Sequence, residues 1–155
     1  MNAVRGPLYG QGPVCDHILH ALPDWFGIEE SIVQYIREVD DLPTFVAYEG
    51  EAAVGFLSVK QHFPRTAEVY VMGVLVDQQG QGLGSALMRS AEAYLRTQGV
   101  RYLQVKTLAA SHPDEYYMRT RAYYLKMGFE PLEDLNLWGA DNPCLLLVKQ
   151  LGEEE

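Results

Sequence analysis

The clearest functional signal in this sequence is a glycine-rich turn that follows an apolar segment. Residues 71–76 are mostly apolar and rich in valine, and Gly80, Gly82 and Gly84 alternate with other residues shortly after them. Glycine tolerates positive φ and lets the backbone approach a ligand, and the unpaired N–H groups at a helix start attract anions. The pattern therefore predicts a cradle for a ligand that carries a pyrophosphate.

The spacing of the glycines separates the common phosphate-binding loops. A mononucleotide P-loop needs Lys and then Ser or Thr after its last glycine, whereas Ser85 follows Gly84 here. The dinucleotide fingerprint requires a third glycine where Ser85 or Leu87 stands, depending on the starting glycine. A P-loop is therefore excluded, and a Rossmann-like nucleotide-binding protein remains only as a disfavoured alternative.

Two segments carry a resemblance to a known family. Residues 79–84, QGQGLG, fit the signature Q/R-x-x-G-x-G/A and resemble the pyrophosphate loop of the GCN5-related N-acetyltransferases, the GNAT family. Residues 121–130, RAYYLKMGFE, resemble the later helix of that family, which carries an aromatic pair and ends at Gly-Phe before the next strand. Both motifs occur in the family's order, and the resemblance extends over roughly residues 44–150.

The resemblance implies an α/β (α+β) fold with a mixed central sheet of six to seven strands and about four helices. Two central parallel strands would splay to admit the cofactor, and residues 1–155 would form a single N-acetyltransferase domain. The implied activity is transfer of the acetyl group of acetyl-CoA to a primary amine by direct attack in a ternary complex. The alternative is a non-catalytic acyl-CoA-binding or regulatory module of the same fold.

The resemblance also implies a set of cofactor-binding residues. The pantetheine arm would lie along the central strand, and the pyrophosphate would take N–H groups from the glycine-rich turn. The main-chain N–H of Val74, beside a bulge next to Gly73, would stabilise the oxyanion. The family often has Asn at the position of Tyr117, so another residue here holds that part of coenzyme A or the contact is absent. The expected cofactor set is Met72, Gly73, Val74, Val76, Gln79, Gly80, Gln81, Gly82, Leu83, Gly84, Ser85, Tyr117 and Lys126.

Acetyl transfer to an amine needs a base for the ammonium proton and an acid for the departing thiolate. Glu68 is the expected base, because its segment resembles the Ala-Glu-strand segment of the histone acetyltransferase branch. Strict alternation would put Glu68, Tyr70 and Met72 on one strand face. The alternative for Glu68 is a surface ion pair at a strand edge. His62 and His112 are the other candidate bases.

Tyr124 is the expected acid, because the family's tyrosine occupies this place before the Gly-Phe and can donate a hydrogen bond to the sulfur. Tyr123 is its packing neighbour. The alternative is that both tyrosines are core aromatics whose hydroxyl groups are already hydrogen-bonded.

The acceptor should be recognised by Trp25 and Phe26, an aromatic pair flanked by acidic residues, together with Tyr70. Alternatively, Trp25 and Phe26 attach two helices to the sheet. The acceptor is a small-molecule or peptide amine, and its identity stays open among polyamines, aminoglycosides, amino acids, xenobiotic amines and protein N-termini or lysines. Tyr116, Tyr117 and Trp138 would add aromatic lining.

Hydrophobic periodicity and turn residues give the order of elements that would position these groups. A helix between two buried strands forms a crossover, so those two strands should be parallel. The first twelve residues are crowded with Gly and Pro and are expected to be irregular, and residues 145–148 at a sheet edge leave a homodimer open. Helices are expected at 14–22, 30–39, 82–97 and from His112-Pro113 to Gly128, and strands at 44–48, 52–59, 69–76, 102–108, 129–132 and 145–151.

Composition limits the partners and the compartment. The net charge of −9, from 12 basic and 21 acidic residues, argues against nucleic acid and suits an amine-bearing acceptor better. No apolar segment approaches the length that a bilayer requires, and two cysteines are too few for a disulfide framework. We expect a cytoplasmic protein with no membrane partner and an acidic, solvated tail at 152–155. Cys15, His17 and His20 lack a distant fourth ligand, so no metal site is expected.

Overall fold

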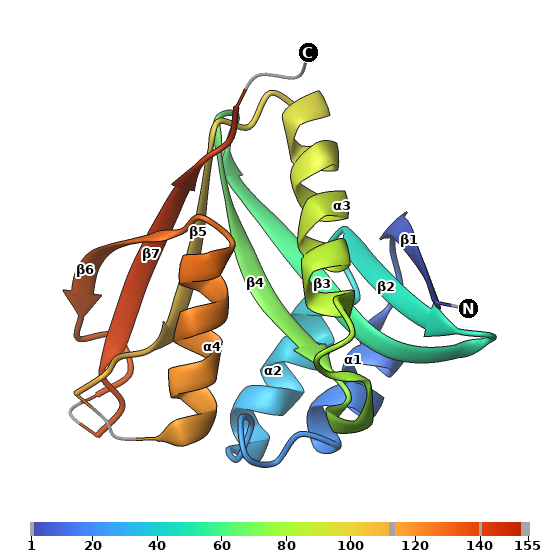
Figure 1. Ribbon diagram of the computed structural model, residues 1–155, viewed down its shortest axis with the longest axis horizontal. Coiled ribbons are helices and arrows are strands. Elements are labelled where there is room, and N and C mark those ends of the chain that lie inside the picture. Colours follow the sequence, from blue (N-terminus) through green and yellow to red (C-terminus); the bar gives the residue numbers. More distant parts are fainter. Residues whose placement is uncertain (1, 112–113, 140, 153–155) are drawn as a thin grey trace.

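The computed structural model describes residues 2–111, 114–139 and 141–152, which form a mixed sheet with helices on both faces. The sheet has seven strands in the order β1-β2-β3-β4-β5-β7-β6 (Figure 1). The strands are β1 (Asn2–Leu8), β2 (Thr44–Glu49), β3 (Ala52–Phe63), β4 (Thr66–Val74), β5 (Tyr102–Leu108), β6 (Glu130–Leu135) and β7 (Cys144–Gln150). The helices are α1 (Gly12–His20), α2 (Glu29–Val39), α3 (Leu83–Thr97) and α4 (Glu115–Lys126), with a 3₁₀ turn, η1, at Val76–Gln78.

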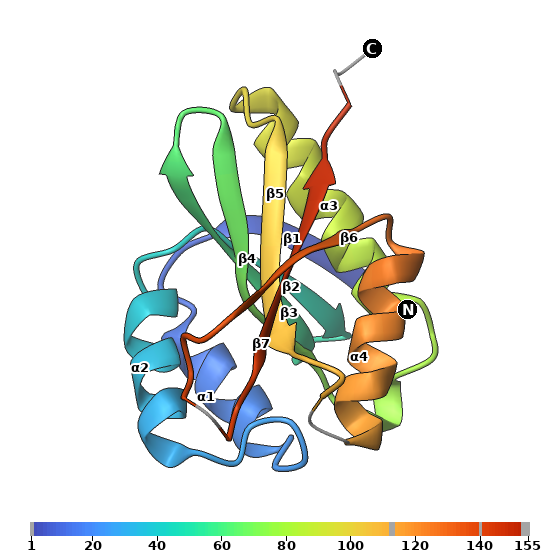
Figure 2. The ribbon, with the colours of Figure 1, turned by 90° about the vertical axis from the view of Figure 1, so that its left-hand side faces the viewer.

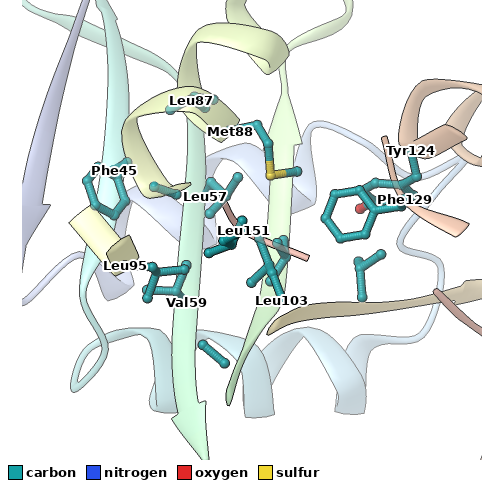
Figure 3. Packing of buried hydrophobic residues seen from close by; sticks show 14 of the residues in the cluster. Phe45, Leu57, Val59, Leu87, Met88, Leu95, Leu103, Tyr124, Phe129 and Leu151 are labelled. Carbon is teal, nitrogen blue, oxygen red and sulfur yellow. The ribbon is translucent and has the colours of Figure 1, made fainter. Parts of the chain in front are cut away.

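The helices divide into two pairs, with α1 and α2 on one face of the sheet and α3 and α4 on the other (Figure 2). The apolar residues of α3 recur at helical spacing, so one stripe of this helix is buried against the sheet. Leu57 and Leu103 from the sheet lie in the same core as Leu87 and Met88 from α3 (Figure 3). Both faces of the sheet are therefore covered by packed helices, and a site has to lie at the strand ends.

The first strand corrects the expectation that residues 1–12 are irregular. β1 pairs antiparallel with β2 from Asn2 opposite Glu49 to Leu8 opposite Thr44, with a register shift after Arg5. β1 is an edge strand, where Pro7 does not interrupt a ladder on both sides. Pairing with β2 therefore overrides the local effect of glycine and proline.

The two central strands β4 and β5 are parallel, as the crossover predicted, and they diverge. Their pairing begins at Thr66 opposite Tyr102 and ends at Val69 opposite Val105. β4 nevertheless continues to Val74 and β5 to Leu108. In Figure 1 the two strands spread apart toward their carboxyl ends, and α4 is seen between them in this view. The splayed central pair that the family resemblance implied is confirmed.

Several boundaries and one strand position differ from the sequence-based expectation. β4 ends at Val74, so Val76 lies in the 3₁₀ turn instead of the strand. β7 lies between β5 and β6, which makes the expectation of a sheet edge at residues 145–148 wrong. β6 pairs antiparallel with β7 on the side away from β5, so the last strand of the chain is an inner strand. The edge strands of the sheet are β1 and β6.

The fourth helix starts later than the dipeptide that was expected to begin it. Asp114 caps α4, because its Oδ1 accepts hydrogen bonds from the N–H groups of Tyr116 and Tyr117. His112 and Pro113 lie outside the described residues, as do residues 153–155 of the acidic tail. Among the described residues, no helix has the length and apolar character needed to cross a membrane.

His20, considered above with His17 for a metal, is engaged in a contact between two helices. Its Nδ1 lies 2.7 Å from Oδ1 of Asp16, and its Nε2 lies 2.9 Å from Oε1 of Glu29. The hydrogen bonds to Glu29 and Asp16 raise the pKa of His20 to about 9. The charged imidazole therefore joins α1 to the start of α2.

Candidate active site

A cavity of about 890 Å³ opens where β4 and β5 diverge. Its wall is formed by the α1–α2 connection, α2, the second halves of β4 and β5, the glycine-rich turn and α4. Of the residues predicted for the site and its aromatic lining, Glu68, Val76, Gln81 and Tyr116 do not line it. Those that do are Trp25, Phe26, Tyr70, Met72, Gly73, Val74, Gln79, Gly80, Gly82, Leu83, Gly84, Ser85, Tyr117, Tyr124, Lys126 and Trp138.

The glycine-rich turn presents the start of α3 to this cavity. Gly80 and Gly82 have φ of 79° and 81°, in the left-handed region that favours glycine. Gly82 is the N-cap, no side chain caps the helix, and its first turn contains no acidic residue. The hydroxyl of Tyr123 donates to the carbonyl oxygen of Gly84 at 2.8 Å and holds the turn against α4. The positive end of the helix dipole is thus available to an anion.

The second half of β4 has no partner strand on its β5 side. Pairing with β5 stops at Val69, so the backbone from Met72 to Val74 borders the cavity. Gly73 has a packing role that the sequence did not reveal. A Cβ at this position would lie 2.9 Å from Cδ1 of Leu22 and 3.2 Å from Cγ2 of Ile18, so glycine lets α1 and the residues after it pack closely against β4.

A bulge at Tyr70 overturns the expected alternation along β4. Val71 lies opposite Ser58 and Val69 lies opposite Val59, so Tyr70 is the extra residue. The predicted bulge next to Gly73 therefore occurs three residues earlier. Tyr70 stays on the face of α2, where its hydroxyl donates to Glu38, whereas Met72 packs on the α3 face. Glu68 and Met72 do not share a face.

Glu68 is buried, with 7% of its surface exposed, and both of its carboxylate oxygens accept hydrogen bonds. Nε2 of His62 lies 2.8 Å from Oε1, and Nζ of Lys106 lies 2.9 Å from Oε2. These residues come from β3, β4 and β5. Glu68 is therefore not an ion pair at the surface, and it does not face the cavity directly. Lys106 does line the cavity, and its ammonium contacts the carboxylate.

Tyr124 lies deep in the wall of the cavity, with 6% of its surface exposed. Its ring packs edge-on against Phe129 and next to Tyr123. In the described part of the chain no hydrogen-bond partner is found for its hydroxyl. Burial raises the pKa of Tyr124, so the phenol keeps its proton at neutral pH and can donate it.

Trp25 lines the cavity and also connects the α1–α2 segment to α4. Acceptor recognition and a packing role, the two alternatives for this residue, are therefore compatible. Its Nε1 donates to Oγ1 of Thr120 at 3.2 Å, and its ring meets Tyr116 edge-on at 4.9 Å between centroids. Tyr117 donates its hydroxyl to the carbonyl oxygen of Trp25, and burial raises the pKa of Tyr117 to about 12. Tyr117 thus ties α4 to the α1–α2 connection, with its hydroxyl already engaged. Phe26 packs against Tyr35.

Two buried polar groups at the cavity were missed by the sequence reasoning. Oγ1 of Thr107 and Oε1 of Gln78 are buried without a hydrogen-bond partner among the described residues, and both side chains line the cavity. Buried polar groups are rarely unpaired, so these atoms indicate a ligand with polar groups of its own. Thr107 is one of three polar residues in the strand 102–108, beside Gln104 and Lys106, so the sequence did not single it out. His112, the other candidate base, lies outside the described residues.

Comparisons with known proteins agree with this geometry. The model of the acetyltransferase (GNAT) family matches residues 14–129. Mycothiol acetyltransferase from Corynebacterium glutamicum strain ATCC 13032 is 34% identical over 93 residues, which cover 60% of this chain and 30% of that protein. The chain therefore spans less than a third of the length of this curated relative.

Solved structures are similar over almost the whole chain. A GNAT-family protein from Desulfovibrio desulfuricans has a TM-score of 0.84 at 19% identity and covers 98% of this chain and 100% of its own. A GNAT-family acetyltransferase from Elizabethkingia anophelis, solved with acetyl-CoA bound, has a TM-score of 0.71 at 18% identity, covering 97% and 98%. At these identities the likeness establishes the fold.

Proposed function

The chain belongs to the acetyltransferase (GNAT) family, and from this premise we propose that it transfers the acetyl group of acetyl-CoA to a primary amine. One observation carries the proposal: a single cavity joins an uncapped helix N-terminus, an unpaired stretch of β4 and the buried Tyr124. Those are the features needed to hold a pyrophosphate, align an amide-bearing arm and protonate a thiolate.

The residues around the cavity fit coenzyme A. The N–H groups at the start of α3, from Leu83 to Ser85, suit the pyrophosphate. The free edge of β4 from Met72 to Val74 suits the amides of the pantetheine arm, as an added strand would. Gln78 offers a buried acceptor oxygen beside this path. Lys126, at the end of α4, adds a positive charge for the phosphates.

The chemistry is direct attack of the amine nitrogen on the thioester carbonyl. The ammonium of the acceptor first loses one proton, the N–C bond then forms, and the C–S bond breaks as the oxyanion collapses. The departing thiolate takes a proton from Tyr124, and the second amine proton, lost as the amide forms, returns to the phenolate of Tyr124. Tyr124 supplies the proton to the sulfur, and main-chain N–H groups of β4 stabilise the oxyanion. Glu68 does not line the cavity and its carboxylate already accepts a hydrogen bond from Lys106, so it would receive the proton of the acceptor indirectly.

The acceptor would enter between the α1–α2 connection and α4, where Trp25, Phe26, Tyr35 and Tyr70 supply aromatic wall. Such a wall suits an amine with an apolar body, whether it is a small molecule or a peptide. The match to mycothiol acetyltransferase covers too little of that protein for its acceptor to be carried over.

The test is amine-dependent release of free thiol from acetyl-CoA, measured across a panel of amines with a no-amine control. Tyr124→Phe should lower kcat by about 10²-fold while coenzyme A binding, measured by calorimetry, stays unchanged. Tyr102→Phe is the matched control, because Tyr102 is exposed and does not line the cavity. Coenzyme A binding without thiol release for any amine would favour the non-catalytic acyl-CoA-binding module. Failure to bind coenzyme A would refute both.

A further inference from the structure

A lysine from the central strand β5 presents a positive charge to the cavity. Val105 packs in the core under α3, so by alternation the next side chain, Lys106, points to the face of α2. Lys106 lines the cavity, and 23% of its side chain is exposed. An ammonium has three N–H donors. One reaches Oε2 of Glu68 at 2.9 Å, and no other partner is found among the described residues. Lys106 therefore has donors left for a ligand.

A second donor, the hydroxyl of Tyr35 on α2, belongs to the same cavity wall. Tyr35 lines the cavity, and no hydrogen-bond partner for its hydroxyl is found in the described part of the chain. Burial raises the pKa of Tyr35, and the charge of Glu68 adds to the effect. The phenol therefore keeps its proton at neutral pH and can donate it in a hydrogen bond.

The carboxylates on this side of the cavity already accept hydrogen bonds. Glu38 accepts from Tyr70 and Lys60, and both oxygens of Glu68 are occupied. Neither glutamate lines the cavity. Among the described lining residues Asp114 is the one acid, and its Oδ1 caps α4. The wall thus offers donors to an anion but few oxygens to a second cation, which disfavours polyamines and aminoglycosides.

Aromatic rings continue the wall from this donor pair toward the α1–α2 connection. The ring centroids of Tyr35 and Tyr70 lie 5.4 Å apart, and those of Tyr35 and Phe26 lie 6.1 Å apart. All three rings line the cavity, as does Trp138 from the connection between β6 and β7. Aromatic surfaces of this kind suit an aromatic ring of the ligand. Because Tyr35 belongs both to the rings and to the donor pair, a ligand that fits carries a ring and an anion close together.

We propose that the amine acceptor of this chain is a free aromatic amino acid, whose carboxylate is bound by Lys106 and Tyr35. The inference rests on the proposed acetyltransferase activity and names its substrate class. The carboxylate accepts an N–H of Lys106 and the O–H of Tyr35, and the ring of the amino acid lies against Phe26 and Tyr70. The α-amino group is the nitrogen that receives the acetyl group.

The first experiment compares amino acids with the amines that lack only the carboxylate. Thiol release from acetyl-CoA is measured with phenylalanine, tyrosine and tryptophan, and with phenylethylamine, tyramine and tryptamine. The readout is the ratio of kcat/KM for each amino acid to kcat/KM for its matching amine. Dividing the ratio of a variant by that of the wild type cancels both the reactivity of the amine and any general loss of activity.

Lys106→Met should lower this ratio by about 10- to 100-fold, because it removes a charged hydrogen bond to the carboxylate. Tyr35→Phe should lower it several-fold and leaves the contact between Lys106 and Glu68 in place. Lys60→Met is the matched control, since Lys60 also pairs with a glutamate, Glu38 at 3.1 Å, but does not line the cavity. The ratio should be unchanged in this control.

Two results would overturn the proposal. One is a ratio that stays at the wild-type value in both Lys106→Met and Tyr35→Phe. The other is wild-type protein that acetylates the matching amines, or a polyamine such as spermidine, and none of the three amino acids.

A second measurement does not depend on turnover. In calorimetry with protein saturated with coenzyme A, at least one of the three amino acids should bind more tightly than its matching amine. Lys106→Met should abolish that difference, and a wild-type protein without it would also overturn the proposal. Coenzyme A binding without thiol release for any amine would instead refute the proposed activity, so the two failures are distinguishable.

Discussion

At the scale of single residues, burial decides which side chains can react, and the two cysteines illustrate this. Cys15 is fully buried in α1, where burial, with a smaller contribution from the charge of Asp16, raises its pKa to about 12. Burial also raises the pKa of Cys144 in β7. Because the thiolate is the reactive form, neither thiol should react with an aromatic disulfide reagent at pH 8.

The measurement is absorbance of the released aromatic thiol, with and without guanidinium. We expect no fast labelling of the native protein, complete labelling after unfolding, and a rise in native labelling only as the pH approaches the raised pKa. Rapid native labelling at pH 8 would contradict the burial of both thiols. If the expectation holds, thiol assays of this protein report the thiol of coenzyme A alone.

The residue types along the chain predicted some of the site residues. The tyrosine before Gly-Phe was expected at the cavity, and Tyr124 lines it. The sequence also singled out Glu68 as a carboxylate on the central strand, but it did not predict which side chains contact Glu68. His62 and Lys106 reach it from separate strands, and no spacing along the chain specifies that they meet.

At the scale of elements, the start of α3 depends on one glycine conformation. Gly82 and Gly99 have similar positive φ angles, 81° and 83°, and a Cβ added at either position would have no atom within 4 Å. Alanine should therefore cost about 1–2 kcal/mol at each position. Only Gly82 lies in the turn that lines the cavity.

Gly82→Ala and Gly99→Ala should accordingly lower Tm by similar amounts, as measured by thermal unfolding. Calorimetry should find weaker coenzyme A binding in Gly82→Ala alone, because only there do the N–H groups of the cradle shift. Equal affinity in both variants would argue against the role of this turn in binding.

A buried ion pair fixes the far end of α3. Nζ of Lys149 on β7 lies 2.9 Å from Oε2 of Glu92 and donates to the carbonyl oxygen of Met127 at 2.7 Å. Lys149→Met should destabilise the protein by about 3 kcal/mol, because it leaves a buried carboxylate with only Arg96 as partner.

Denaturant unfolding measures this loss. The double variant Glu92→Leu/Lys149→Met should recover much of it, since both charges are then removed. A double variant as unstable as the sum of its single changes would show that packing, and not the uncompensated charge, dominates.

At the scale of the whole molecule, the cavity is closed by contacts between segments far apart in the chain. Trp25 from the α1–α2 connection reaches Thr120 and Tyr116 on α4. The glycine-rich turn lies elsewhere on the cavity wall, at the start of α3. Under the proposed function, these two parts of the wall would be an acceptor side and a cofactor side.

Trp25→Phe should raise the KM of the acceptor several-fold and leave coenzyme A affinity unchanged, because it removes the Nε1 donor and loosens only the acceptor side. Steady-state kinetics with a reactive amine and calorimetry with coenzyme A measure the two effects. Thr120→Val removes the other partner, and the two changes should be less than additive when combined. A loss of coenzyme A affinity in Trp25→Phe would mean that the two sides are not separate.

The sequence by itself determined the order of most strands and helices, the parallel central pair and the glycine-rich turn. These follow from hydrophobic period and from glycine conformation, which are properties of short segments. Only the tertiary structure decided that β1 forms, that β7 lies inside the sheet and that a bulge at Tyr70 turns Met72 to the other face. It also decided that Glu68 meets His62 and Lys106. Each of these depends on pairing between distant segments, whose energy no local pattern contains.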